Sequence, residues 1–150
     1  MTTLKAGDKA PEFTAKNQNG QDIKLSDYKG KKLVLYFYPK DNTPGCTAES
    51  CNLSDNYTAL QKSGYEVLGV STDNEKSHLN FKNKYNFPFD LLADPDKKLV
   101  NLYGVYGEKK LYGKPYMGTI RTTFIIDEKG VIENVIDKVD TKQHTSQILV

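Results

Sequence analysis

The sequence predicts an α/β fold in which a central mixed β-sheet is flanked by helices. Two observations carry this prediction. Apolar segments of strand length alternate with segments of helical periodicity, and two further strand-like segments follow one another near the end of the chain. The 150 residues, 37% of them hydrophobic, are enough to bury a core without metal or disulfide support. Because no linker-like or repeated segment interrupts the chain, we expect residues 1–150 to form a single domain.

The first two elements are a hairpin and a buried strand. Residues 12–15 and 23–25 flank the turn-like sequence Asn-Gln-Asn-Gly at 17–20, which is typical of a small N-terminal β-hairpin. Residues 33–38 read Leu-Val-Leu-Tyr-Phe-Tyr. This continuous apolar and aromatic run is expected of a strand that is covered on both faces.

A helix and a second buried strand follow. Leu53, Tyr57 and Leu60 recur at spacings of four and three residues, which places them on one face of an amphipathic helix. Gly64 is a stop signal for that helix, and residues 66–71 are again apolar enough for a buried strand.

The second half of the chain continues the alternation and ends with another hairpin. We expect helices over 74–85 and 96–103, a short final helix from Asp140 towards Leu149, and strands over 89–93, 122–126 and 131–135. The last two strands are joined by the turn Asp-Glu-Lys-Gly at 127–130, so they form a β-hairpin. Apart from the short strand over 89–93, the helix over 96–103 and the final helix, the order after the N-terminal hairpin is β-α-β-α-β-β, which resembles a thioredoxin-like layout, although periodicity alone does not indicate that fold.

The residues best suited to chemistry follow the strand over 33–38. If Thr43 is the N-cap of the next helix, Pro44 occupies the first helical position, where proline is favoured, and Cys46 lies in the first turn. Unpaired backbone N–H groups and the positive end of the helix dipole then surround the sulfur. Such surroundings favour the thiolate, which is the nucleophilic form, so we expect a reactive thiol at Cys46.

A second cysteine, Cys51, lies five residues further along the same predicted helix. Five helical residues separate the two side chains by about 140° around the axis and by about 7.5 Å along it, beyond the usual span of a disulfide. A bond between the two sulfurs therefore requires the helix to unwind locally. Structural disulfides are rare in the cytoplasm, where we expect this chain, so the cysteines are interpreted as free, catalytic or redox-sensing thiols.

The segment around Cys46 resembles the active-site signature of a known enzyme family. The pattern Pro-x-x-x-Thr-x-x-Cys, formed by Pro39, Thr43 and Cys46, is similar to that of the peroxiredoxins. Its continuation, Cys-Thr-x-Glu-x-Cys, resembles the bacterioferritin comigratory protein (peroxiredoxin Q) branch. The similarity covers most of the chain, because it extends to residues 7–13, 69–73 and 121–127.

This resemblance implies a role for each residue of the signature. Cys46 corresponds to the peroxidatic cysteine and Cys51 to the resolving one. Thr43 is then expected to hydrogen-bond the sulfur or the peroxide, and Pro39 to shield the site from water. Arg121 is expected to hold the thiolate and orient the peroxide oxygen, and a permanent cation beside sulfur favours the thiolate on physical grounds alone.

Two more residues belong to the candidate site. Glu49 matches a further position of the resemblance and is expected to shape the first helical turn. The backbone N–H groups of Gly45 and Cys46, with the Thr43 hydroxyl, are candidate donors to the oxygen that leaves when a thiolate attacks a peroxide. The alternatives are that Cys46 only packs as a small hydrophobic residue, that Arg121 is an ordinary surface ion-pairing residue, and that Cys51 is a buried spectator.

The resemblance also implies a reaction cycle. Hydrogen peroxide or an organic hydroperoxide oxidises Cys46 to a sulfenic acid, Cys51 condenses with it to a Cys46–Cys51 disulfide, and thioredoxin or a similar dithiol reductant restores both thiols. No metal and no organic cofactor is expected, and the branch favours a monomer or weak dimer. The alternatives are a non-catalytic redox sensor and a thiol–disulfide exchange protein, although the Cys-x-x-Cys motif typical of exchange proteins is absent.

Charge and hydropathy predict neither a nucleic-acid nor a membrane partner. The chain has 21 basic and 19 acidic residues, a net charge of +2, and its lysines are scattered. The longest apolar run, at 33–38, is far too short to span a membrane, and the start of the chain lacks the apolar core of a signal peptide. We therefore expect a cytoplasmic protein.

Two further groups of residues are assigned no function. A zinc site formed by the two cysteines with His78 and His144 matches no familiar spacing, and both histidines lie in polar segments that we expect to be exposed. The tyrosine-rich residues 103–116 lack the basic groove expected of a surface that stacks nucleic-acid bases. We expect them to form an aromatic loop packed over the core.

Overall fold

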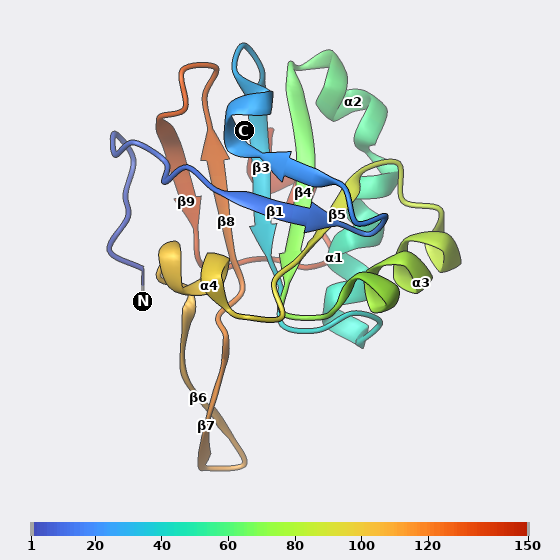
Figure 1. The fold of residues 1–150 in the computed structure, drawn as a ribbon, viewed down its shortest axis with the longest axis vertical. Helices are drawn as coiled ribbons and strands as arrows, with labels where there is room; N and C mark the ends of the chain where they lie inside the picture. The colour runs from blue at the N-terminus through green and yellow to red at the C-terminus, as the bar shows by residue number, and fades with distance from the viewer. Residues whose placement is uncertain (1, 150) are drawn as a thin grey trace.

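The computed structural model describes residues 2–149, and within them the chain forms a seven-stranded mixed sheet covered by helices (Figure 1). The strands are β1 (Thr14–Asn17), β2 (Asp22–Lys24), β3 (Lys32–Phe37), β4 (Tyr65–Ser71), β5 (Asp90–Ala93), β6 (Tyr106–Leu111), β7 (Lys114–Thr119), β8 (Thr122–Ile126) and β9 (Ile132–Ile136). The helices are the 3₁₀ helix η1 (Leu25–Tyr28), α1 (Pro44–Asp55), α2 (Tyr57–Lys62), α3 (Glu75–Tyr85), α4 (Lys98–Leu102) and α5 (His144–Ile148). The predicted α/β fold with a mixed sheet is confirmed.

Strands of the main sheet lie in the order β2-β1-β5-β4-β3-β8-β9. β3, β4 and β5 run parallel to one another, and the remaining pairs are antiparallel. Both predicted hairpins are present: Ala15 pairs with Ile23 in β1–β2, and Phe124 pairs with Val135 in β8–β9. Residues 33–38 are fully buried because β3 lies inside the sheet, between β4 and β8.

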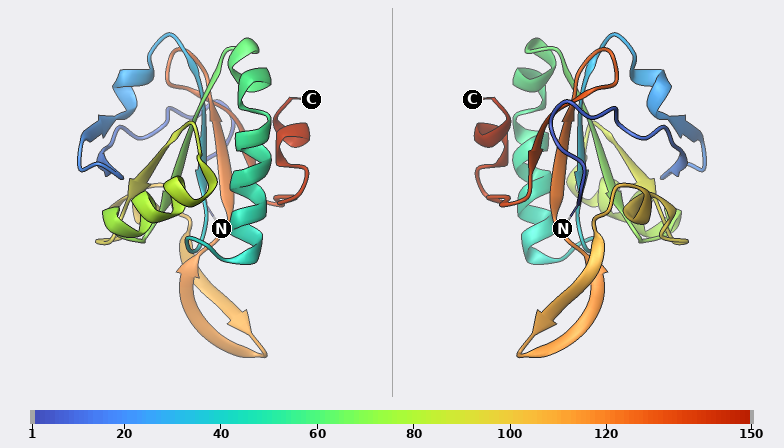
Figure 2. Two further views of the ribbon diagram at one scale, coloured as in Figure 1. Left: turned by 90° about the vertical axis from the view of Figure 1, so that its right-hand side faces the viewer. Right: turned by 90° about the vertical axis from the view of Figure 1, so that its left-hand side faces the viewer.

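Side chains of residues 33–38 alternate between two core layers. The odd-numbered ones join a cluster that includes α4 and the segment before β1. The even-numbered ones point to the opposite face, which α1, α2, α3 and α5 cover. Figure 2 shows α1 and α5 together on one side of the sheet. Cys46 belongs to the second cluster, so its thiol is built into the core.

A close approach between β3 and β4 places a hydroxyl beneath α1. A Cβ atom at Gly69 would lie 2.8 Å from the ring of Tyr36, so only glycine leaves room for this tyrosine. The Tyr36 hydroxyl then lies 2.8 Å from Ser50 Oγ, inside the buried face of α1. This hydrogen bond joins the helix of the two cysteines to the centre of the sheet.

The predicted helix over Leu53, Tyr57 and Leu60 is divided in two. Asn56 lies between α1 and α2 with φ −107° and ψ 12°, outside the helical range. Its side-chain amide donates to the Asn52 carbonyl oxygen at 2.8 Å, a bond that competes with regular helix hydrogen bonding. The apolar stripe is therefore shared by two consecutive helices.

Residues 103–116 were predicted to form a loop packed over the core, and for most of residues 106–119 this prediction is wrong. They form the β6–β7 hairpin, which projects from the end of the molecule at which β3 and β4 end (Figure 1). The two turn residues, Tyr112 and Gly113, have φ of +52° and +78°, as a type I′ turn requires. This tight turn lets the two strands pair along their whole length, and Tyr112 is left 97% exposed. Of the tyrosines in this region, Tyr103 packs in the core and the half-buried Tyr106 packs against it, as predicted.

Both histidines are fully buried, so their predicted exposure is wrong. His78 bonds Asp41 through Nδ1 and the Leu92 carbonyl oxygen through Nε2. His144 bonds Gln147 through Nδ1 and Thr123 through Nε2. A polar neighbourhood in the sequence did not predict exposure because hydrogen bonds to distant residues satisfy both rings inside the protein.

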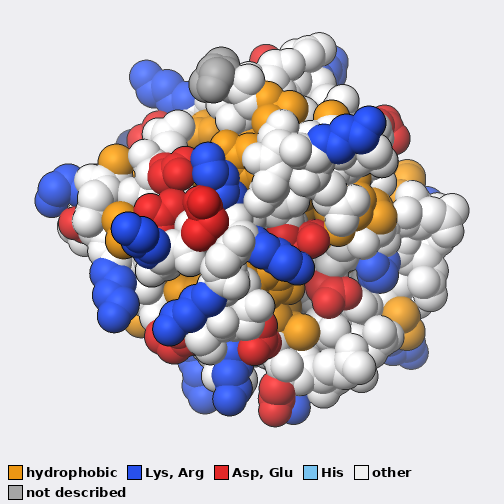
Figure 3. Space-filling view, turned by 90° about the horizontal axis from the view of Figure 1, so that it is seen from above, with side chains coloured by type: hydrophobic (Ala, Val, Ile, Leu, Met, Phe, Trp, Pro, Cys, Tyr) orange, Lys and Arg blue, Asp and Glu red, His pale blue; other side chains and the backbone are white. Residues whose placement is uncertain are grey.

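Surface charge is mixed on the face opposite the β6–β7 hairpin. Figure 3 shows basic and acidic side chains interspersed there, with neither sign gathered into a continuous patch. Among residues 2–149, none of the helices has the length and apolarity that crossing a membrane requires.

Candidate active site

Cys46 lies in the first turn of α1, directly after the loop that follows β3. The backbone at Thr43 is extended (φ −98°, ψ 157°), Pro44 opens the helix, and the sulfur-bearing residue is only 1% exposed. The thiol thus lies at the positive end of the helix dipole, close to N–H groups that have no partner within the helix. This arrangement is the one expected of a nucleophilic cysteine.

Arg121, which lies between β7 and β8, connects the thiol to a buried acid. Its Nη2 donates to Cys46 Sγ at 3.2 Å, and its Nη1 donates to Glu49 Oε1 at 2.7 Å. The guanidinium is permanently charged, and at this distance it stabilises a thiolate over a thiol. Three residues predicted from the sequence are therefore brought into direct contact.

Gly45 leaves room for that guanidinium. A Cβ atom on Gly45 would lie 3.2 Å from Arg121 Nη2, tighter than ordinary van der Waals contact. A side chain at this position would press on the arginine that contacts the sulfur. Gly45 thus contributes its small size to the site in addition to its backbone N–H.

Glu49 is fully buried and carries an unusual carboxyl group. Burial raises the pKa of Glu49 to about 7, and the charge and hydrogen bond of Arg121 oppose that rise. Among the described residues its Oε2 atom accepts no hydrogen bond, and His144 Nε2 lies 3.4 Å away from it. Burial also lowers the pKa of His144, so this ring adds little positive charge beside the carboxyl.

Thr43 and Pro39 border the thiol from the loop. The Thr43 hydroxyl donates to the Lys40 carbonyl oxygen at 2.9 Å rather than to the sulfur, and its oxygen accepts no capping hydrogen bond from the helix N–H groups. Pro39 and Thr43 are both half-buried. The hydroxyl is therefore near the site but is engaged within its own loop.

Cys51 lies on α1 with Cys46, as predicted, and both thiols are free. Cys51 is half-buried, and burial together with the charge of Asp55 raises the pKa of its thiol. The helical spacing, about 140° around the axis and about 7.5 Å along it, keeps the two side chains apart while α1 is intact.

The sequence did not predict three neighbours of this site. Lys109 of β6 lies near enough to Arg121 and Cys46 that both affect its pKa, which burial and Arg121 lower. His144 and Thr123 approach Glu49 from α5 and β8. For Thr123 the sequence did offer a signal. Thr123 follows Arg121 by two residues, and side chains two residues apart in a strand lie on the same face, so the two can be expected to point towards the same site. No signal was available for His144, which comes from a distant short helix.

The histidines and cysteines of the dismissed zinc site are not brought together. His78 lies with Asp41 and Asp73, and these are the residues among those described whose ligand atoms cluster closely enough to suggest a cation. His144 lies with Glu49 and Thr123 instead.

The fold and this site define a thiol-dependent redox protein, and comparisons with known proteins identify its family. The AhpC/TSA family model matches residues 6–135. Peroxiredoxin Bcp of Bacillus subtilis (strain 168) is 45% identical over 147 residues, which are 98% of this chain and 94% of that protein. The chain belongs to the AhpC/TSA family, in its Bcp or peroxiredoxin Q branch, and is a thiol peroxidase that reduces peroxides.

Solved structures agree with this assignment. The peroxiredoxin Q of Xylella fastidiosa matches with a TM-score of 0.92 and 33% identity, covering 99% of this chain and 95% of its own. The bacterioferritin comigratory protein of Xanthomonas campestris matches with a TM-score of 0.85 and 36% identity, covering 91% and 87%. The predicted thioredoxin-like fold and the family resemblance are both confirmed.

Proposed function

We propose that Cys46 is the peroxidatic thiol of a single-domain enzyme that reduces hydrogen peroxide and organic hydroperoxides. The thiolate attacks one peroxide oxygen, an S–O bond forms as the O–O bond breaks, and the other oxygen leaves and takes up a proton. The sulfur loses two electrons and becomes a sulfenic acid. The observation that carries this proposal is the 3.2 Å contact between Arg121 Nη2 and Cys46 Sγ at a helix N-terminus.

The surrounding residues have complementary roles in this proposal. Arg121 holds the thiolate and, with the N–H groups of Gly45 and Cys46, stabilises charge on the departing oxygen. Thr43 donates to the peroxide after its hydroxyl turns from the Lys40 carbonyl, and Pro39 keeps water out. Organic hydroperoxides are included because the solved X. campestris relative is described by its alkyl peroxide reduction activity.

We further propose that Cys51 resolves the sulfenic acid. Its thiol gives up a proton, the thiolate attacks Cys46 Sγ as the S–O bond breaks, and the departing hydroxide takes up a proton and leaves as water, so that an intramolecular disulfide forms. Because an intact α1 separates the two side chains, this step follows local unwinding of the helix. A dithiol protein of the thioredoxin type then exchanges with the disulfide and restores both thiols. Sulfur carries the electrons throughout, so the proposed cycle uses no metal or organic cofactor.

The decisive experiment is the reaction of the reduced protein with hydrogen peroxide, quenched at intervals and read by intact mass. We expect a rate orders of magnitude above that of free cysteine, ending at the mass of an intramolecular disulfide. The Cys51→Ser variant is expected to stop at the mass of one added oxygen, and Cys46→Ser is expected not to react. A rate equal to that of free cysteine would contradict the proposal.

The alternatives differ in turnover. A non-catalytic redox sensor is oxidised once per molecule and recycles slowly, whereas the proposed enzyme consumes many equivalents of peroxide when thioredoxin and its reductase are supplied. A thiol–disulfide exchange protein reduces disulfide substrates without peroxide. We expect sustained peroxide consumption, and we expect the enzyme to be cytoplasmic. We also expect a monomer or weak dimer, and sedimentation at several protein concentrations would identify this oligomeric state.

A further inference from the structure

Asp41 is a buried acid in the loop that leads to Cys46. It lies five residues before the thiol, between Pro39 and Thr43, and is 8% exposed. Its Oδ1 accepts from the Tyr38 hydroxyl at 2.6 Å. Its Oδ2 lies 2.8 Å from Ser77 Oγ, which donates to it, and 2.7 Å from His78 Nδ1.

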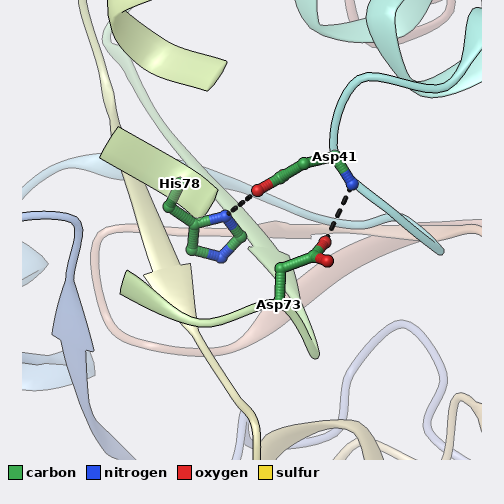
Figure 4. A group of neighbouring side chains, drawn as sticks. All are labelled: Asp41, Asp73 and His78. Carbon is green, nitrogen blue, oxygen red and sulfur yellow. Dashed lines mark hydrogen bonds and ion pairs between the residues drawn. The ribbon is translucent and has the colours of Figure 1, made fainter. Parts of the chain in front are cut away.

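The backbone of the same residue is also tied down. The Asp41 N–H donates to Asp73 Oδ2 at 2.8 Å (Figure 4). The Ser71 hydroxyl donates to the same oxygen at 2.6 Å. His78 Nε2 reaches the Leu92 carbonyl oxygen of β5 at 2.9 Å. Asp41 is therefore connected to the ends of β3, β4 and β5 and to the start of α3.

The partners of His78 determine where its protons lie. The Leu92 carbonyl only accepts, so Nε2 carries a hydrogen, and a second hydrogen must lie between Nδ1 and Asp41 Oδ2. The Asp41 carboxyl already accepts from Tyr38 and Ser77, which suits an anion. The donors thus indicate an imidazolium–carboxylate pair. Since both ring nitrogens and both carboxylate oxygens are engaged, a cation could bind only by displacing these hydrogen bonds.

We propose that the Asp41–His78 pair is a positioning element for peroxide reduction. It holds the loop over 39–43 on the strand ends and so sets where the first turn of α1 presents Cys46. The first turn of α1 can shift only slightly, because the backbone at Gly45 lies so close to Arg121 that not even a Cβ atom would fit between them without strain. A loop that shifts would misalign the sulfur, the Thr43 hydroxyl and the guanidinium towards the peroxide. This inference rests on the proposed role of Cys46.

The test uses Asp41→Ala and Asp41→Asn in a Cys51→Ser background, where Cys46 is the only thiol. Asp41→Ala is expected to slow oxidation by hydrogen peroxide about tenfold or more, since misplaced reacting groups cost rate steeply. Alkylation of Cys46 by iodoacetamide, which needs no oriented peroxide, should change much less. Asp41→Asn should recover most of the peroxide rate, because an amide can donate to Nδ1 and accept from Tyr38. Asp137→Ala, an exposed acid beyond β9, is the matched control.

A second readout follows the pair itself. Nitrogen NMR of His78 is expected to show a proton on each ring nitrogen with Asp41 present, and on Nε2 alone in Asp41→Asn. Asp41→Ala oxidised as fast as the control would overturn the proposal. So would equal losses in oxidation and alkylation, or an Asn variant as slow as the Ala variant. Failure of the proposed function is separate, because it would appear as an unreactive Cys46 with Asp41 intact.

Discussion

Arg121 is the residue on which the electrostatics of the site depend. It lies between a thiol and a buried carboxyl, and it is the shared hydrogen-bond donor to both. Its side chain is 22% exposed, so water screens the guanidinium only in part. A permanent charge in such a place stabilises negative charge on sulfur before the reaction and on oxygen during it.

Replacing Arg121 should therefore affect the chemistry far more than the fold. We expect Arg121→Gln to lower kcat/KM for hydrogen peroxide about 100-fold, the usual effect of removing one donor to developing charge. Arg121→Lys should recover only part of this loss, because an ammonium cannot bond Sγ and Glu49 with a planar fork. Stopped-flow peroxide kinetics measure the effect, and the exposed Lys129→Ala serves as control. Equal rates for wild type and Arg121→Gln would remove Arg121 from the mechanism.

Glu49 should make stability depend on pH. Its pKa is about 7 in the fold against an ordinary value of 4.5, so the stability it contributes is fully present below about 4.5 and is lost as the pH rises to about 7. Glu49→Gln cannot ionise and keeps an acceptor for Arg121. The variant should therefore gain on wild type across this range, by about 3 kcal/mol in the free energy of unfolding.

Urea unfolding of the reduced proteins at pH 4.5, 6 and 8 measures this difference. Glu128→Gln, at an exposed position, should track wild type at each pH. A Glu49→Gln difference that does not change with pH would show that the Glu49 carboxyl has the same pKa in the folded and the unfolded protein, which would contradict the raised value.

At the level of elements, the proposed cycle requires α1 to be both well formed and able to open. Its first turn is placed by the loop that Asp41 anchors, and its second half is held by α5. Asn52 makes the second connection: its Oδ1 accepts from the Thr145 N–H at 2.8 Å, and its Nδ2 donates to the Lys142 carbonyl oxygen at 3.0 Å. Because Cys51 immediately precedes Asn52, α5 restrains the segment that has to unwind in the proposed resolution step.

Weakening that connection should speed disulfide formation. Asn52→Ala removes two side-chain hydrogen bonds that contribute about 1 kcal/mol each, so the opened form should be populated roughly 30-fold more. Rapid-quench mass analysis should show a faster step from sulfenic acid to disulfide and less over-oxidation at high peroxide. Gln61→Ala, at an exposed site on α2, is the control. An unchanged resolution step would mean that α5 does not restrain α1.

For the whole molecule, oxidation should lower stability. Disulfides usually stabilise proteins by constraining the unfolded chain. Here the bond between Cys46 and Cys51 is incompatible with an intact α1, and opening that helix exposes part of a core cluster that includes Leu53. We expect the oxidised protein to show less helical circular dichroism and a lower Tm than the reduced one. A higher Tm after oxidation would contradict unwinding.

Local sequence was sufficient to predict three features: the alternation of strands and helices, the β1–β2 and β8–β9 hairpins, and the position of Cys46 at the start of a helix. Apolar runs such as 33–38, the turns at 17–20 and 127–130, and Thr43-Pro44 act through neighbouring residues, so their effects can be predicted without a fold. Cys51 on the same helix follows from spacing alone. The division of the helix at Asn56 was missed, because an asparagine there signals only a weak preference.

Tertiary structure decided which distant residues meet. Arg121 reaches Cys46 because β8 pairs beside β3, and His144 and Asp41 become buried because chain segments far apart in the sequence satisfy their polar atoms. The sequence also did not show that residues 106–119 would pair with each other as a projecting hairpin rather than pack as a loop over the core. Such outcomes depend on long-range burial and pairing, which local propensity does not encode.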